Sequence, residues 1–215
     1  MIRSEHLCAY LVAAVVLLAG PAGAAVTYSY TADPASYDVL PNETVSVAVY
    51  LTETIGPAEA SPLADRGGLF SFDLLVEEAA AGTQAATILS AAINTAFDGD
   101  VDNAPPMIIA NRSIFAPTGA PAAVADPVTR RVLLATLTIG AGGVVGETTA
   151  FRLADYENSQ TPGTDTNTFY WDDITAEDPL DADVVESGFT VTVIPEPATL
   201  ALLGLGALAV RRWRR

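Results

Sequence analysis

The sequence predicts an all-β protein, an antiparallel β-sandwich between two apolar terminal segments. Three observations predict this fold. Apolar and polar residues alternate in four separate runs, clusters of Gly, Pro and Asn separate these runs at intervals typical of a sandwich, and the most apolar stretches lie at the two ends. A chain of 215 residues, half of them hydrophobic, can bury one core without disulfides. We therefore divide it into residues 1–25, 26–194 and 195–215.

The first segment, residues 1–25, has the order of a secretory signal peptide. A short polar start precedes the apolar run 7–20, and small residues follow at the positions that signal peptidases require. The expected cleavage region is Ala22, Ala24 and Ala25. A retained N-terminal anchor is the alternative, although the run is short for a spanning helix and ends in Pro and Gly. We expect an exported protein.

The central segment, residues 26–194, contains the runs with a period of two. In a strand, successive side chains point to opposite faces, so each run is expected to bury one face. The predicted core faces are Val45, Val47, Val49 and Leu51; Phe70, Phe72, Leu74 and Val76; Leu133, Ala135, Leu137 and Ile139; and Phe189, Val191 and Val193. Further strands are predicted over residues 86–92, 107–109 and 113–115.

The composition excludes several classes of function. The chain has no Lys, which excludes Schiff-base chemistry and the Lys-dependent phosphate loop. Residues 26–194 contain 24 acidic residues and five Arg, a net charge of −19, which is the wrong sign for binding nucleic acid. Signal cleavage would also remove His6 and Cys8, the only His and Cys, and with them any His/Cys zinc site, Ser-His-Asp triad or disulfide. The exported chain is left with carboxyl and tyrosine groups for proton transfer.

One acidic loop is a candidate calcium site. Asp98, Asp100 and Asp102 alternate in a loop that also contains Gly99, a spacing that lets a turning backbone direct several oxygens at a hard cation. The loop is not a complete EF-hand, because Ile109 stands at the twelfth position, where a Glu is needed. No cofactor is required by the sequence; Ca²⁺ at this loop and a plain solvated loop are the two interpretations.

A pair of aromatic residues is the candidate glycan-binding site. Tyr170 and Trp171 follow Phe169, and adjacent strand residues face opposite ways, so at least one ring is expected to point outward. Exposed aromatic faces can stack on sugar rings, whereas a single Trp in a sandwich also fits the core. Both interpretations stay open.

The third segment, residues 195–215, combines three ordered parts. Pro195, Glu196 and Pro197 are followed by the apolar residues 198–210 and by a terminal basic cluster of Arg211, Arg212, Arg214 and Arg215 around a Trp. Thirteen apolar residues give a helix of about 20 Å, shorter than a hydrocarbon core of about 30 Å, but the Arg cluster fits a cytoplasmic stop. We expect a short transmembrane helix; a core helix with a basic end is the alternative.

These three parts resemble the PEP-CTERM sorting signal of Gram-negative bacteria. The resemblance covers about twenty residues at the C-terminus. It implies processing by an exosortase-type transpeptidase after export, and a location at the cell surface or in the exopolysaccharide matrix. Its proline residues would keep an extended segment accessible outside the bilayer.

The central segment is similar to cohesin modules of the carbohydrate-binding-module-like sandwich. The similarity rests on a Pro-Asn-Glu-Thr-Val-Ser-Val turn and strand at 41–47, on residues 68–74, on residues 133–139 and on a Gly-rich turn before the closing strand. It implies a cohesin-like jelly roll. Where cohesins have a Tyr-Asp-Pro turn this chain has residues 77–80, Glu-Glu-Ala-Ala, so no dockerin-binding residue is carried over.

Taken together, the residues and the two resemblances predict a surface or matrix structural protein that is not an enzyme. A module that binds polysaccharide or a surface protein without catalysis is the alternative. A glycosidase would need a carboxylate pair that no sequence signal singles out.

Overall fold

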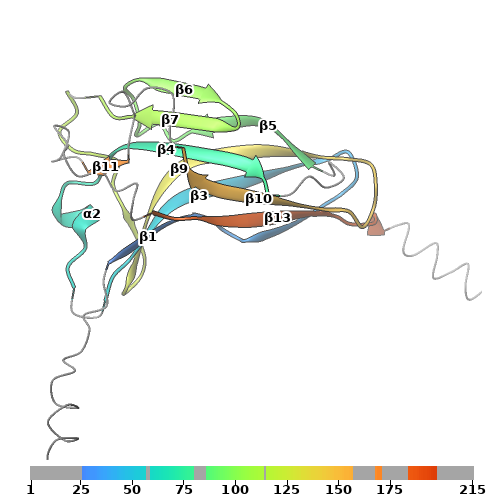
Figure 1. Cartoon of the computed structure of the whole chain (residues 1–215), viewed down its shortest axis with the longest axis horizontal. Coiled ribbons are helices and arrows are strands. Elements are labelled where there is room, and N and C mark those ends of the chain that lie inside the picture. Colours follow the sequence, from blue (N-terminus) through green and yellow to red (C-terminus); the bar gives the residue numbers. More distant parts are fainter. Residues whose placement is uncertain are drawn as a thin grey trace, which may run out of the picture.

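The computed structural model describes residues 26–56, 59–79, 86–113, 115–156, 168–170 and 184–197. These residues form two β-sheets packed face to face around one hydrophobic core (Figure 1). The all-β sandwich predicted from the sequence is confirmed. One short helix, α2 (Pro62–Asp65), lies in the connection between the third and fourth strands.

The first sheet has the strand order β12-β1-β3-β9-β5, and β8 also pairs with β9. Its strands are β1 (Thr27–Ala32), β3 (Thr44–Thr54), β5 (Ala86–Ile93), β8 (Ala123–Asp126), β9 (Thr129–Ala141) and β12 (Val184–Val185). The second sheet has the order β2-β13-β10-β4-β7-β6, with β11 paired to β4. Its strands are β2 (Ser36–Val39), β4 (Leu69–Glu78), β6 (Val101–Ala104), β7 (Met107–Asn111), β10 (Thr148–Asp155), β11 (Phe169–Tyr170) and β13 (Ser187–Val193).

Both sheets are mixed, which corrects the antiparallel prediction. β1 runs parallel to β12, and β2 runs parallel to β13, whereas the other pairs are antiparallel. The chain passes from the first sheet to the second twice, from β1 to β2 and from β12 to β13. These two stretches run side by side in the same direction, so each gives one strand of a parallel pair to both sheets. A period of two shows which face of a strand is buried and does not show the direction of its partner.

The predicted inward faces are confirmed along β13 and along β3 from Val47 onward, whereas Val45 is half-buried. Val47, Val49 and Leu51 are fully buried, as are Val191 and Val193. The strand predicted at 86–92 is present as β5, and that at 107–109 is present as β7. The strand predicted at 113–115 is wrong, because Ser113 and Phe115 lie outside strands.

The inward face predicted for β9 is correct only in its second half. Leu137 and Ile139 are fully buried, but Leu133 is only half-buried and its neighbours Val132 and Leu134 are in the core. Opposite β3, the register shifts between Ala135 and Leu133, so that Leu134 is an extra residue. This β-bulge reverses the alternation, which a uniform period cannot predict.

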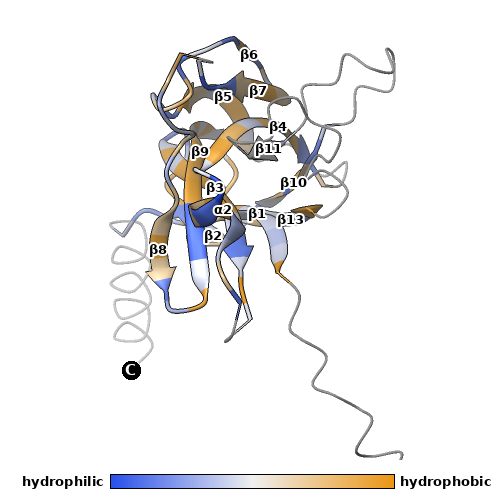
Figure 2. Ribbon diagram, turned by 90° about the vertical axis from the view of Figure 1, so that its left-hand side faces the viewer, coloured by the Kyte–Doolittle hydropathy of each residue, from blue (hydrophilic) through white to orange (hydrophobic). Residues whose placement is uncertain are grey.

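β4 is buried on both faces over most of its length, although the sequence predicts one buried face. Phe72 and Leu74 are in the core, and Ser71 and Asp73 on the opposite face are also buried. The hydroxyl of Thr168, just before β11, donates to the Asp73 carboxylate at 3.1 Å and lies 2.9 Å from the Tyr30 hydroxyl. Tyr30 also donates to the Asp73 carbonyl at 2.9 Å. These bonds connect β1 of one sheet with β4 and β11 of the other, and they satisfy polar groups that burial would otherwise penalise. Much of β4 and of β9 has the orange colour of hydrophobic residues (Figure 2).

A fully buried carboxyl group, that of Glu53, closes the end of the sandwich near α2. One carboxyl oxygen accepts hydrogen bonds from the Tyr28 hydroxyl at 3.2 Å and from the backbone N–H of Leu63 at 2.9 Å. The other accepts from the hydroxyl of Ser61, the residue that caps α2. Glu53 therefore ties the end of β3 to β1 and to the 61–63 turn.

Candidate functional site

One depression on the described surface lies at a fork in the first sheet. The first residues of β9 pair with β8, and the later residues of β9 pair with β5 on the same side. The bulge at Leu134 falls where β9 changes partner. The two partners diverge there and leave a depression of about 310 Å³, which we call the fork pocket. It is lined by Tyr50, Asn94, Ala96, Pro121, Ala123, Val124, Ala125, Arg131 and Leu133.

Asn94, the first residue after β5, forms hydrogen bonds with β9 at the point where the sheet forks. Its side-chain amide donates to the Leu133 carbonyl at 2.8 Å, and its backbone N–H donates to the Leu134 carbonyl at 2.8 Å. Its side-chain oxygen accepts from the backbone N–H of Ala96 at 3.1 Å. Asn94 thus satisfies the edge of β9 where neither β5 nor β8 reaches it.

Arg131 is the charged group of the fork pocket. Its guanidinium carbon lies 5.7 Å from the centre of the Tyr50 ring, and its Nη1 donates to the Asp33 carboxylate at 2.5 Å. Its Nε is buried and has no hydrogen-bond partner in the described part of the chain. A guanidinium beside an aromatic ring suits a polar or anionic group presented on a flat, partly apolar molecule. Among the residues that line the pocket there is no carboxyl, thiol or imidazole group, and its polar side chains are those of Tyr50, Asn94 and Arg131.

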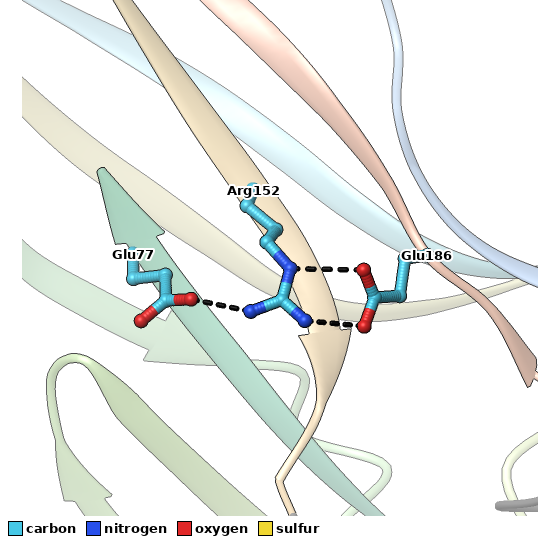
Figure 3. Close-up of polar contacts among 3 residues, drawn as sticks. All are labelled: Glu77, Arg152 and Glu186. Atoms are coloured by element: carbon cyan, nitrogen blue, oxygen red, sulfur yellow. Dashed lines mark hydrogen bonds and ion pairs between the residues drawn. The ribbon is translucent and has the colours of Figure 1, made fainter. Parts of the chain in front are cut away.

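A second cluster of charge lies on the outer surface of the other sheet. Arg152 of β10 donates through Nε to Glu186 at 2.9 Å and also through Nη2 to the same carboxylate. Its Nη1 donates to Glu77 of β4 at 2.5 Å (Figure 3). These hydrogen bonds lower the pKa of Glu186. The three side chains are between 39 and 55% exposed, so we regard the cluster as a surface tie between β4, β10 and the residue before β13.

The predicted calcium ligands are exposed and are not gathered around one point. Asp98 accepts from the backbone N–H of Ser113 at 2.9 Å, a bond that lowers the pKa of its carboxyl group. The Asp100 backbone N–H donates to the Asn111 side chain at 2.8 Å, and Asp102 lies in β6. Within the described ranges, no group of three or more His, Cys, Asp or Glu side chains could hold a metal ion. Calcium binding at this loop stays a prediction.

Of the two predicted glycan-binding residues, Tyr170 is the last residue of the described range 168–170 and Trp171 follows it. Tyr170 belongs to β11, whose backbone pairs with β4 at Leu69 and Ser71. Trp171 lies outside the described residues. The fork pocket was not predicted from the sequence, although Arg130 and Arg131 are the one adjacent pair of basic residues in residues 26–194.

The predicted sorting motif begins where the folded domain ends. The Ile194 backbone N–H donates to the Val39 carbonyl at 2.9 Å, Pro195 is half-buried, and Glu196 and Pro197 are exposed. The cleavage region Ala22, Ala24 and Ala25 and the cluster of Arg211, Arg212, Arg214 and Arg215 lie outside the described residues. No helix in the part of the chain that the structure describes is long and apolar enough to span a membrane.

Comparison with known families decides the meaning of the C-terminal motif. Residues 193–215 match the PEP-CTERM protein-sorting motif. The chain carries a PEP-CTERM sorting signal. This signal implies an exported protein that exosortase-type machinery processes, as the sequence predicts. No curated protein matches the chain.

Two solved structures are similar to the chain at 9% identity. One is a type III cohesin module from the cellulosomal cell-surface anchoring scaffoldin ScaE of Ruminococcus flavefaciens, with a TM-score of 0.44, covering 79% of this chain and 87% of the module. The other is BcpA, the major pilin subunit of Bacillus cereus, with a TM-score of 0.27, covering 80% of this chain and 40% of the pilin.

Proposed function

We propose that the protein is a structural component of the cell surface or of the exopolysaccharide matrix, delivered there through its C-terminal signal and acting without catalysis. The observation that carries this proposal is the PEP-CTERM match at residues 193–215, whose Pro195 lies one residue beyond the last strand-edge hydrogen bond. Glu196 and Pro197 are exposed on the described chain, so a membrane-bound transpeptidase can reach them without unfolding the sandwich.

The tail supplies the means of retention. Before processing, the apolar residues 198–210 lie in the membrane and the Arg cluster lies on its cytoplasmic side, which leaves the acidic sandwich outside. The buried carboxyl groups also fit a structural role. Hydrogen bonds from neighbouring groups engage the buried carboxyl groups of Glu53 and Asp73, as expected of structural groups.

A second candidate function is carbohydrate binding without catalysis, and the fork pocket favours it. Tyr50 provides an aromatic ring, and Arg131 provides a guanidinium next to it, which are the groups that hold sugars and their acidic substituents. The ligand would be the host's own extracellular polysaccharide. Binding of a surface protein at a cohesin-like face is a third candidate, which rests on the sequence resemblance.

Replacement of the exposed part of the motif tests the main proposal. In cells that carry the double variant Glu196→Ala and Pro197→Ala, we expect the protein to disappear from the surface and matrix fractions and to accumulate with the membrane. Both side chains are exposed, so the sandwich should remain folded. Fractionation followed by immunodetection measures the distribution.

The matched control is the double variant Glu43→Ala and Pro127→Ala, which changes the same residue types at exposed positions outside the motif. It should reach the surface as the unmodified protein does. An equal surface fraction for both double variants would contradict sorting through the motif.

A further inference from the structure

The last strand, β13, ends at one end of the sandwich, beside two turns. At one end, which we call the exit end, lie the turn at residues 40–43, the β9–β10 turn at residues 142–147 and Ile194, where the chain leaves the fold. Hydrogen bonds join these three parts: Asn42 N–H to the Gly142 carbonyl at 3.1 Å, Gly146 N–H to the Val193 carbonyl at 2.8 Å, and Ile194 N–H to the Val39 carbonyl at 2.9 Å. The end of β13 and the β9–β10 turn lie together on the right of Figure 1, opposite α2.

The β9–β10 turn carries two exposed apolar side chains at its tip. Val144 is 57% exposed and Val145 is 48% exposed. Valine is a poor turn residue, and turns usually carry polar residues or Gly. The turn projects beyond Val193, because Gly146 is already hydrogen-bonded to the last residue of β13. The tip therefore extends past the point where the chain leaves the fold.

The chain from the fold to the apolar tail is very short. Three residues lie between Ile194 and Ala198, the first residue of the apolar run, and the four steps from one Cα atom to the other span at most about 14 Å when fully extended. The headgroup region that such a link must cross is about 5–8 Å thick on each side of a bilayer. When residues 198–210 are in the membrane, the exit end cannot be more than about 6–9 Å above the headgroups.

We propose that the exit end docks on the lipid bilayer, with Val144 and Val145 inserted at headgroup depth while the tail is in the membrane. This inference rests on the membrane-held tail of the proposed function. It also sets the orientation of the domain. β1 begins opposite the end of β3, and Thr27 pairs with Thr54, whereas Thr44 pairs with Gly140 near the exit end. The eleven residues of β3 span about 33 Å, so the N-terminus and α2 point away from the membrane.

The charges of the exit end favour a shallow contact over a deep one. Glu43 and Glu147 flank the valine tip, and carboxylates are repelled by anionic lipid surfaces and disfavour burial in hydrocarbon. Two valines alone would bind a bilayer weakly, but the tail converts their contact into an intramolecular one with a high effective concentration. The contact therefore depends on the tail.

A single fluorescent probe tests the docking. The chain from residue 26 to residue 215 keeps every described residue and contains no Cys, so Val144→Cys gives one labelling position. The matched control is Val124→Cys, which is 67% exposed in β8; β8 pairs with the beginning of β9, at the end opposite the exit end. Each variant is labelled with an environment-sensitive dye and added to phosphatidylcholine vesicles that contain brominated lipid, which quenches dyes within the bilayer.

We expect both variants to sediment with the vesicles, the dye at position 144 to be quenched, and the dye at position 124 to remain unquenched. If the protein binds the vesicles but brominated lipid quenches the two dyes to the same extent, the docking is overturned and the tail anchor remains. Failure of the chain to sediment would overturn both. Cross-linking of position 144 to a membrane protein in cells, together with no quenching in vesicles, would assign the exit end to a protein partner and overturn the lipid contact.

Discussion

Replacement of Glu53 by Ala is expected to destabilise the sandwich by about 3–5 kcal/mol, a large part of the stability of a domain of this size. The variant removes one acceptor of the Tyr28 hydroxyl, and it leaves the Ser61 hydroxyl and the Leu63 N–H buried without theirs, at about 1–3 kcal/mol for each of the latter two groups. It also opens a cavity at a position that is fully buried. Urea unfolding followed by circular dichroism measures the change.

Two further variants separate this explanation from a general effect of losing an acidic residue. Glu43→Ala removes an exposed carboxyl group just before the same strand and should change the stability by less than about 0.5 kcal/mol. Glu53→Gln keeps an acceptor oxygen in place and should lie between the two. If Glu53→Ala unfolds at the same urea concentration as Glu43→Ala, Glu53 does not close the end of the sandwich.

Replacement of Arg131 by Ala is expected to weaken binding of the host's extracellular polysaccharide by about tenfold or more, since a charge-assisted hydrogen bond contributes about 1.5–3 kcal/mol. Tyr50→Ala should have a similar effect, because the ring lies beside the guanidinium in the fork pocket. A pull-down of the purified protein with the isolated polysaccharide, performed with calcium and with a chelator, measures the binding.

Controls in the same pull-down separate the candidate sites. Arg152→Ala removes an exposed Arg that is outside the fork pocket and should leave binding unchanged. Loss of binding with Trp171→Ala alone would place the site at the aromatic pair predicted from the sequence. Loss with chelator would implicate the loop of Asp98, Asp100 and Asp102. No binding by the unmodified protein in either buffer would contradict the second candidate function and leave the structural role.

The strand faces could be predicted because burial has a strict period of two in strands. The alternation is complete in β13, and in β3 it extends to Leu51, where Val47, Val49 and Leu51 are buried and Val45 is half-buried. It fails at Leu133, where a bulge inserts an extra residue, and at Asp73, whose face is covered by a segment distant in sequence that includes Thr168. A local alternation of residues indicates neither where a bulge occurs nor which distant segment covers a strand.

The sorting motif could be predicted because it is a contiguous sequence with three parts, whereas the fork pocket could not. The pocket combines Tyr50 of β3, Asn94 after β5 and Arg131 of β9, with residues of β8. It exists because β9 changes partner from β8 to β5 at a bulge, which is a property of the sheet and not of any one segment. Similarly, only the register of β10 and β13 shows that Val144 and Val145 lie at the point where the chain leaves the fold.

We propose that the C-terminal signal delivers the protein to the cell surface or matrix and is processed during delivery. The most direct test is the intact mass of the protein extracted from the cell surface or matrix. We expect a chain that begins near residue 26 and lacks the residues after the Pro195-Glu196-Pro197 motif, with or without an added surface group. A surface protein whose mass corresponds to the complete chain through Arg215 would contradict processing at the motif.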